Sequence, residues 1–221
     1  MKKWTMVLSA AVLAAALLTG CSQEGDSFEK KTYTSGDQPV SAVYIDVQDR
    51  QIEVSLSPDE QVRVDYSESA KEYYDISLSE EGVLTMTAQS SKTWTDYIGA
   101  GTPAGADVIS LQVPDALLSC LSLRTTKEDV TLPALSVTDS ITLTNNGGDI
   151  TFDTLQVGSA LSVENKNGDI EGSVLGSRGE YSISCTIKKG DSNLPELEEG
   201  GEKSLQAVNN NGDINITFVS E

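Results

Sequence analysis

Short runs of alternating apolar and polar residues fill the second half of the chain, and they return at a nearly fixed interval. Each repeat contains a polar corner rich in asparagine and glycine that ends in an aspartate. Four near-copies and one degenerate first copy place these aspartates at Asp129, Asp149, Asp169, Asp191 and Asp213. The steps are 20, 20, 22 and 22 residues. A short period of this kind indicates a solenoid, in which each repeat is one turn of a stacked coil.

Apolar positions keep the same distance from the aspartate in successive repeats, which defines five ladders. Two lie eight and six residues before it: Leu121, Ile141, Leu161, Ile183, Leu205, and Leu123, Leu143, Val163, Cys185, Ala207. Three lie one, three and six residues after it: Val130, Ile150, Ile170, Ser192, Ile214, then Leu132, Phe152, Gly172, Leu194, Ile216, then Leu135, Leu155, Leu175, Leu197, Val219. Alternation within each run is strand spacing. We therefore predict turns of three short strands with one face inward, stacked ~4.8 Å apart.

The longer steps help to separate the solenoid from its alternative, a flat antiparallel sheet of hairpins, for which Asn-Gly is also a signal. Both additional pairs of residues fall at the same corner, around 176–180 and 198–202. An odd insertion would turn the core face of the next strand to solvent, whereas an even one need not. The pattern favours an all-β, single-stranded β-helix-like solenoid of about five turns.

Residues 37–107 are predicted to form a β-rich cap and a loop before the repeats of 108–221. Alternating runs such as Val43, Ile45 and Val47 indicate strands, but no fixed period links them. A solenoid has to cover its first turn with something non-repeating, and this section is the natural cap. Its long loop, residues 89–107, carries Trp94 and Tyr97, which either form a recognition surface or pack back on the cap.

The first 20 residues have the features of a targeting segment. Lys2 and Lys3 precede an apolar stretch that is too short for a comfortable membrane span. The stretch ends in Leu18-Thr19-Gly20-Cys21, which resembles a bacterial lipobox. This resemblance implies that residues 1–20 are a lipoprotein signal peptide and that Cys21 is lipidated, with several acyl chains holding the protein to a bilayer. The alternative is an ordinary signal peptide followed by a chance cysteine.

Residues 21–36 are mostly polar and lack a strong apolar period. We predict that they form a lipidated, flexible tether. The alternative is an N-terminal strand that uses Phe28 and Tyr33. The expected location is extracytoplasmic, with the protein lipid-anchored to a bacterial membrane at the cell surface or on its periplasmic face.

The chain is strongly acidic, with 15 basic and 34 acidic residues and a net charge of −19. Removal of residues 1–20 leaves 13 basic against 34 acidic residues, a net charge of −21. Nucleic acid and anionic membrane surfaces are disfavoured as partners because their phosphates would be repelled. The expected partners are the membrane, through the lipid on Cys21, and an envelope or extracellular protein or glycan.

Candidate catalytic chemistry is sparse. The sequence has no histidine, which removes the commonest general base and metal ligand. Cys120 is expected to face outward and Cys185 inward, three turns apart, and roughly 14 Å is too far for a disulfide. We find no nucleophile–base pair, zinc spacing or phosphate loop, and predict neither a cofactor nor an enzymatic activity.

The recurring Gly-Asp is the one polar constellation. Its carboxylates are expected to accept hydrogen bonds from backbone amides at the corner. Asn145, Asn165 and Asn209, each four residues before an aspartate, could stack as an amide ladder. The alternative is calcium bound between turns, with Asp149, Asp169 and Asp213 as candidate ligands. The repeat lacks the glycine-rich nonapeptide spacing of known calcium-binding coils.

The order of these motifs resembles the bacterial putative-adhesin domain family of unknown function. The resemblance rests on a β-rich start, on Ile109-Ser110-Leu111-Gln112-Val113-Pro114, and on an apolar pair before each Asn-Gly-Asp-Ile, over roughly residues 40–219. It implies a right-handed β-solenoid-like fold and a cell-surface setting, and it brings no catalytic residues. The first repeat (Glu128-Asp129) and the third full one (Asp191-Ser192) depart from Gly-Asp-Ile.

These observations lead to a surface lipoprotein that acts as a non-enzymatic, adhesin-like interaction module. Two further hypotheses stay open. One is a structural or sensory envelope component that stacks with its own kind, and the other is a calcium-dependent, polysaccharide-active enzyme. A basic, aromatic-lined groove would favour the enzyme, and the sequence shows none.

Overall fold

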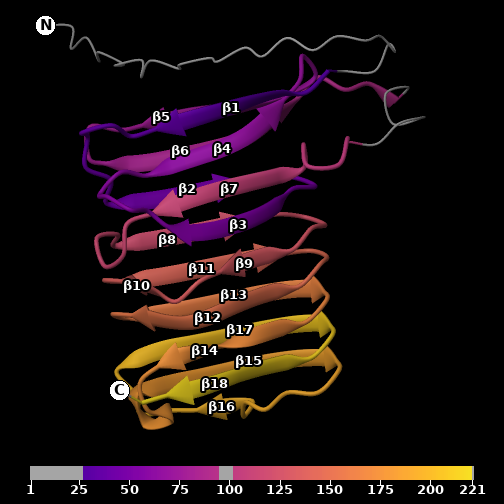
Figure 1. The fold of residues 1–221 in the computed structure, drawn as a ribbon. Helices are drawn as coiled ribbons and strands as arrows, with labels where there is room; N and C mark the ends of the chain where they lie inside the picture. Colours follow the sequence, from indigo (N-terminus) through magenta and orange to yellow (C-terminus); the bar gives the residue numbers. More distant parts are fainter. Residues whose placement is uncertain (1–26, 95–101, 221) are drawn as a thin grey trace, which may run out of the picture.

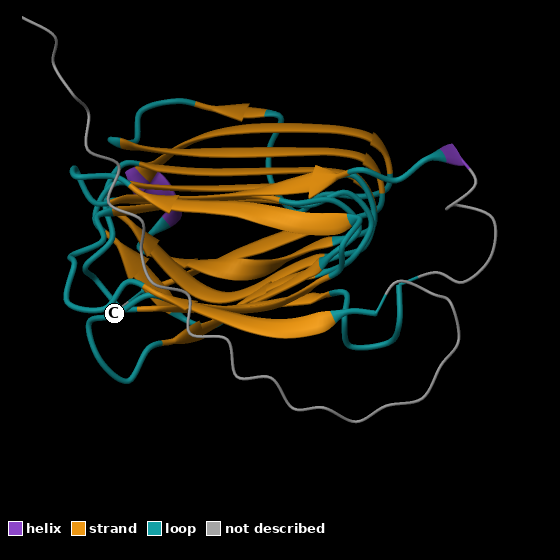
Figure 2. Cartoon of the chain, turned by 90° about the horizontal axis from the view of Figure 1, so that it is seen from above, coloured by secondary structure: helices purple, strands orange, loops and turns teal. Residues whose placement is uncertain are grey.

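The computed structural model describes residues 27–94 and 102–220, and these form two facing β-sheets with the apolar core between them. Each sheet has nine strands. Figure 1 shows the strands stacked as rungs along one axis, and Figure 2, viewed down that axis, shows the two layers. The all-β prediction is confirmed. Among the described residues, no helix has the length and hydropathy needed to cross a bilayer.

The first sheet, sheet A, joins strands from the whole length of the chain. In spatial order it contains β1 (Glu29–Thr34), β4 (Arg63–Glu68), β7 (Val108–Val113), β3 (Gln51–Leu56), β9 (Val130–Leu132), β12 (Ile150–Val157), β14 (Ile170–Leu175) and β18 (Ile214–Val219), and β10 (Leu135–Val137) also pairs with β12. The pairs β1–β4 and β4–β7 are antiparallel, and the others are parallel.

The second sheet, sheet B, faces sheet A. In spatial order it contains β16 (Leu197–Glu198), β15 (Tyr181–Lys189), β17 (Lys203–Asn211), β13 (Ala160–Asn167), β11 (Ser140–Asn145), β8 (Cys120–Arg124), β2 (Ala42–Asp46), β6 (Val83–Ser90) and β5 (Glu72–Leu78). Only its two end pairs, β15–β16 and β5–β6, are antiparallel. A short 3₁₀ helix, η2 (Arg178–Glu180), occupies the first of the corners with additional residues.

The predicted register is confirmed in sheet B. Ile141 pairs with Leu121 on one side and with Leu161 on the other, and Leu161 pairs with Leu205. Ile183 completes this ladder by pairing with Leu205, and all five side chains are buried. Neighbouring side chains of a strand point to opposite faces. The alternation of apolar and polar residues therefore decides which face of each strand lies against the core.

The expectation of three strands per turn is corrected to two sheets. The segment after each corner was expected to break into two strands on different faces. Instead β9 and β10 both pair with the single strand β12, so both belong to sheet A. The interior is therefore a slab between two sheets, which alternating apolar residues fill by interdigitating across the gap.

The regular period predicts that the strands stack in chain order. At both ends of the stack they do not. Strand β17 lies between β13 and β15, so the segment 203–219 is inserted ahead of 181–198 along the axis (Figure 1). At the other end, β2 lies between β6 and β8. The section predicted as a non-repeating cap therefore contributes rungs in register with the repeats. Antiparallel pairing there is confined to the pairs β1–β4, β4–β7 and β5–β6. The right-handed course of the coil stays a prediction.

The ladder six residues after the aspartate is correct only in part, with Leu135 paired to Leu155 and Leu175 paired to Val219. Leu155 pairs with Val174, not Leu175, because the register shifts by one residue between Phe152 and Thr154. This β-bulge brings Val174 into the core. At the far end of the stack Leu197 is 66% exposed and Val219 40% exposed, so neither belongs to the core.

The flexible tether predicted over 21–36 ends earlier than expected. Strand β1 pairs with β4, and Tyr33 is buried opposite Val64. The alternative reading, a strand that uses Tyr33, therefore describes this segment better. Cys21 and the signal segment lie outside the described residues.

Candidate functional site

The corner aspartates form a continuous hydrogen-bonded column that joins neighbouring rungs. The backbone N–H of Asp149 donates to Oδ1 of Asp129 at 2.8 Å, and that of Asp169 donates to Oδ1 of Asp149 at 2.8 Å. The column then passes to Asp213, whose N–H donates to Asp169 at 2.7 Å, before it reaches Asp191, which donates to Asp213 at 2.8 Å. The predicted bond between carboxylate and backbone amide is confirmed. The aspartates follow one another in the order in which the strands stack, which differs from their order in the sequence.

Inside this column runs the amide ladder that the sequence predicts. Asn145, Asn165 and Asn209 are register partners and are fully buried. Each Nδ2 donates to a backbone carbonyl of the neighbouring rung, with Asn165 donating to Gly148 at 2.8 Å. The ladder ends at Asn209, which pairs with Ile187 on its other side. The Oδ1 atoms of Asn145 and Asn165 accept from backbone N–H groups of their own corners, at Gly147 and Lys166. Asn209 Oδ1, in contrast, is one of two buried side-chain oxygens without a hydrogen-bond partner within the described part of the chain.

The glycines of the corner are required by both conformation and close packing. Gly168 has φ 118°, a region that residues with a Cβ rarely adopt. A Cβ on Gly168 would also lie 2.2 Å from the carbonyl oxygen of Gly148 in the next rung. The Asn-Gly-Asp pattern therefore specifies a corner that stacks closely on copies of itself.

This geometry gives the corner a structural role. In Asp149, Asp169 and Asp213, Oδ1 is already engaged by a backbone N–H. Within residues 27–94 and 102–220 there is no group of three or more acidic, cysteine or histidine side chains placed to hold a metal ion. The calcium alternative stays a prediction that a titration decides.

The two cysteines within the described ranges are free thiols. Cys185 is buried in its predicted ladder, and Cys120 is half-buried near Asp139 and Ser140. Because β17 is inserted between β13 and β15, the two cysteines are four strand spacings apart instead of the predicted three, or about 19 Å. The conclusion that they are too far apart for a disulfide is unchanged.

A buried cation joins several strands at the end of the stack where β1 and β5 lie. Arg50 is only 4% exposed, and its guanidinium donates to Glu72 at 2.7 Å and to the hydroxyl of Tyr74 at 2.7 Å. Glu72 also binds Lys92, in the segment that follows β6. Burial raises the pKa of the Tyr74 hydroxyl, while Arg50 acts in the opposite direction. We call Arg50, Glu72, Tyr74 and Lys92 the cap cluster.

The loop aromatics are only partly described. Trp94 is 75% exposed, which excludes the alternative that its ring packs back on the cap. Tyr97 lies outside the described residues. Exposed tyrosines also occur on the outer face of sheet B, at Tyr44 and Tyr73.

An acidic pocket of about 700 Å³ lies beside the same end of the stack. Its wall includes the carboxylates of Asp37, Asp59, Glu60, Glu80 and Glu81, with Leu117 as an exposed apolar member. Arg63, which binds Asp59 at 2.6 Å, holds the pKa of that carboxyl well below its usual range. The pocket is therefore negatively charged at neutral pH.

A family model for the toastrack domain DUF4097 matches residues 40–220. The chain belongs to the toastrack family. No curated protein matches it. The match begins just before β2 and ends after β18, so it covers both sheets of this toastrack domain except for β1.

Solved structures similar to this toastrack domain come from bacteria. A "putative cell adhesion protein" from Clostridium sporogenes aligns over 88% of this chain and 100% of its own, with a TM-score of 0.56 and 12% identity. A "putative adhesin" from Bacteroides fragilis aligns over 89% and 100%, with a TM-score of 0.38 and 10% identity. Another "putative adhesin", from Parabacteroides merdae, aligns over 87% and 96%, with a TM-score of 0.26 and 11% identity. The first of these likenesses supports the toastrack fold.

The cap cluster of this toastrack domain is the feature that sequence reasoning missed. Arg50 stands in a turn between two predicted strands, where a charged residue is ordinarily solvated. Its burial depends on Tyr74 and Glu72, more than twenty residues away in sequence. No local pattern signals such a contact, because it arises only when β5 pairs with β6 at the end of sheet B.

Proposed function

We propose that this protein is a membrane-anchored lipoprotein of the bacterial cell surface or envelope and acts there as a non-enzymatic adhesion module. Lipidation at Cys21 attaches the chain to the bilayer, and the toastrack domain presents its outer faces to an extracellular or envelope partner. The proposal is in keeping with the similar solved structure from Clostridium sporogenes, which is named a "putative cell adhesion protein".

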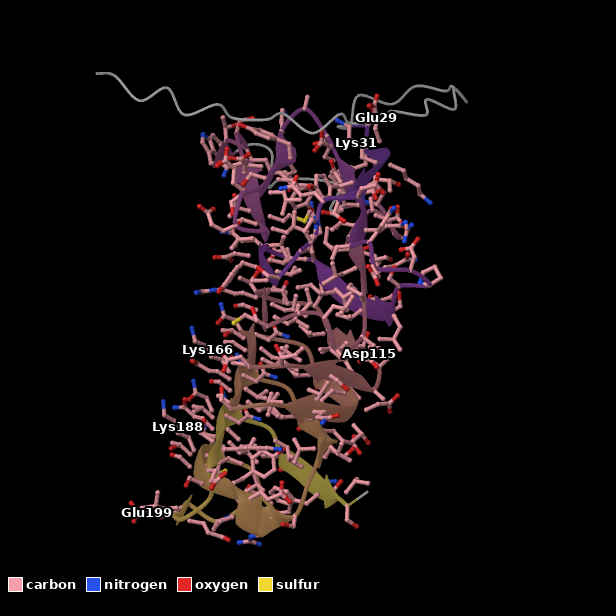
Figure 3. The ribbon with its side chains drawn as sticks, turned by 90° about the vertical axis from the view of Figure 1, so that its left-hand side faces the viewer. Glu29, Lys31, Asp115, Lys166, Lys188 and Glu199 are labelled. Atoms are coloured by element: carbon pink, nitrogen blue, oxygen red, sulfur yellow. The ribbon has the colours of Figure 1, made fainter. Side chains whose placement is uncertain are left out.

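The observation that carries the proposal is the position of the chain entry at one end of the stack. Strand β1 begins at Glu29 and forms the last strand of sheet A, while the loop around Glu199 lies at the opposite end (Figure 3). Glu29 is the eighth residue after Cys21, which limits the tether to about 28 Å when fully extended. The nine strands of sheet B span about 38 Å beyond that point. A lipid on Cys21 would hold one end close to the bilayer and leave the other exposed.

The polar constellation of the coil favours a scaffold over an enzyme. Its carboxylates and amides bind the backbone of neighbouring rungs, as the column from Asp129 to Asp191 illustrates. Groups used in this way hold the corners in register. Recognition is left to the outer faces and the exposed loops, where function commonly resides.

End-to-end stacking with a second copy is disfavoured by the far end of the stack. The edge of β18 is capped by Asn193, whose Oδ1 accepts from the N–H of Ile216 at 3.0 Å and whose Nδ2 donates to its carbonyl at 2.9 Å. One side chain thus replaces the neighbouring strand. The edge of sheet B is the two-residue strand β16, followed by an acidic loop. Short, charged edges oppose strand addition.

The test compares the native full-length chain with the Cys21→Ser variant. We expect acyl groups on Cys21 by mass spectrometry and a membrane-bound protein in the wild type. The variant should lose the acyl groups and leave the membrane fraction after washing. Binding to intact cells or envelope extract should then be measured for both chains in solution. A native protein without acyl groups overturns the anchor, and one that turns over envelope polysaccharide overturns the non-enzymatic role.

A further inference from the structure

We propose that Trp94 is a second membrane contact, which inserts into the interface of the bilayer that holds Cys21 and thereby orients the toastrack domain. This inference rests on the proposed lipid anchor. It assigns a role to the most exposed of the large apolar side chains in the described part of the chain. The occupant is the lipid surface, because the tether brings no other surface as close to this loop.

The strand directions place Trp94 on the same side of the molecule as the chain entry. Strand β1 is antiparallel to β4, which is antiparallel to β7, so β1 and β7 start on the same side. The segment that contains Trp94 leads from the end of β6 toward the start of β7. Figures 1 and 2 show the beginning of β1 and the described segment after β6 on the same side of the domain.

The cap cluster fixes these two segments to each other. Phe28 is the last residue before β1, and the guanidinium carbon of Arg50 lies 5.9 Å from the centre of its ring. Arg50 also binds Glu72, and Glu72 binds Lys92, two residues before Trp94. A cation is attracted to the face of an aromatic ring, and a buried ion pair is costly to break because one charge would be left unpaired. These contacts connect the base of the tether to the base of the Trp94 segment.

The reach of the tether then sets the distance to the bilayer. Phe28 is the seventh residue after Cys21, so it lies within about 25 Å of the lipidated residue. Trp94 leaves the domain on that side with three-quarters of its surface exposed. An exposed tryptophan is unfavourable in water, whereas its amphipathic indole is favoured at the headgroup level of a bilayer.

The charge of the protein limits which lipid surface fits. The acidic chain is repelled by anionic headgroups, and an uncharged indole is not attracted by them. We therefore expect contact with zwitterionic headgroups and weaker contact when anionic lipid is added at low salt. The lipid on Cys21 keeps the loop at the surface, so one weakly binding side chain is sufficient to set the orientation.

The experiment uses tryptophan fluorescence, because the chain has only two tryptophans, Trp4 and Trp94. The lipidated protein, from which the signal peptide with Trp4 has been removed, is purified from membranes, and Trp4→Leu excludes emission from any uncleaved precursor. It is reconstituted into phosphatidylcholine vesicles with and without brominated acyl chains. We expect a blue-shifted Trp94 emission that brominated lipid quenches roughly twofold, as for an indole at the headgroup level. The matched control is Trp4→Leu/Trp94→Leu/Leu197→Trp, which moves the single reporter to an exposed position at the far end of the stack. Its emission should not be quenched.

The outcomes separate the contact from the anchor. Mass spectrometry of the same samples reports the acyl groups on Cys21. An acylated protein whose Trp94 is not quenched overturns the contact and leaves the anchor intact. Equal quenching of Trp94 and of the control tryptophan at position 197 also overturns the contact, since the domain would then lie flat on the bilayer. Emission that changes only when envelope protein is added would assign Trp94 to a protein partner instead. A chain without acyl groups overturns both proposals.

Discussion

The ring of Phe152 occupies the space in which a side chain at Gly172 would stand. The two residues are partners in the neighbouring strands β12 and β14, and a Cβ built on Gly172 falls 2.2 Å from Phe152 Cδ2. The flanking rungs carry Leu132 and Ile216 at the same position of the ladder. In the two rungs between them, the large ring of Phe152 fills the space that glycine leaves at position 172. Such pairing keeps the core dense without voids.

The first prediction concerns this pair. Gly172→Ala should destabilise the protein by about 1–3 kcal/mol, because the added methyl group forces the ring of Phe152 to move in a packed core. Chemical denaturation measures the loss. The matched control is Gly179→Ala, where a Cβ meets nothing within 4 Å and where we expect little change. In the Phe152→Leu background, Gly172→Ala should cost less than in the wild type, and equal losses in both backgrounds would refute the steric explanation.

A second prediction tests which face of β13 is the core face. Leu161 is buried in the middle of the stack, so Leu161→Asp should cost several kcal/mol by burying an unpaired charge. Ser162 lies one residue along and points outward from sheet B. Ser162→Asp should cost under ~0.5 kcal/mol. Similar melting temperatures for the two variants would contradict the register.

The aspartate column gives a third prediction. In the Asp169→Asn variant the amide oxygen can still accept from the N–H of Asp213, and one charge is lost from a column of carboxylates about 5 Å apart. We expect a change close to zero. Asp169→Ala removes the acceptor and should cost about 1 kcal/mol. Urea denaturation of both variants measures the difference, and equal stabilities would show that the bond between the rungs contributes nothing.

Calcium provides the fourth prediction. Because Oδ1 of Asp149, Asp169 and Asp213 is engaged by backbone N–H groups, millimolar calcium should raise the melting temperature no more than magnesium does at equal ionic strength. Thermal denaturation in the two salts is the measurement. A rise that is specific to calcium and disappears in Asp169→Asn would make the column a metal site.

The fifth prediction concerns acid stability and the contact between two rungs at Asp49. Burial by itself would raise the pKa of the Asp49 carboxyl, but hydrogen bonds from Lys127 and Thr126 outweigh it and lower the pKa. The folded pKa lies below the unfolded value, so the stabilisation is complete above that value and is lost as the pH falls through the folded pKa. Wild type and Asp49→Asn should therefore differ in urea midpoint at neutral pH and converge as the pH falls below the ordinary range of a carboxyl group. A difference that does not shrink on acidification would contradict the assignment.

The sequence by itself determined the repeating unit of this protein. Alternation around Leu161 and its ladder partners fixed which side chains face the core, because strand geometry leaves only two faces to choose from. The Asn-Gly-Asp corners fixed how one rung lies on the next, because a stacked corner tolerates no Cβ at Gly168 and needs the amide of Asn165. These are local constraints, and each repeat carries its own copy of them.

The tertiary structure alone decided the order of the rungs, and the similarity of the repeats is the reason. Since each rung presents nearly the same ladders and corner, the pattern does not specify which rung stacks on which. The choice depends on the exceptions: Ile187 cannot extend the amide ladder and Asn193 closes the edge of β18, so 181–198 stands at the end and 203–219 is inserted before it. The cap cluster around Arg50 likewise exists only once distant strands have paired, because a buried charge is tolerated only where its partners converge.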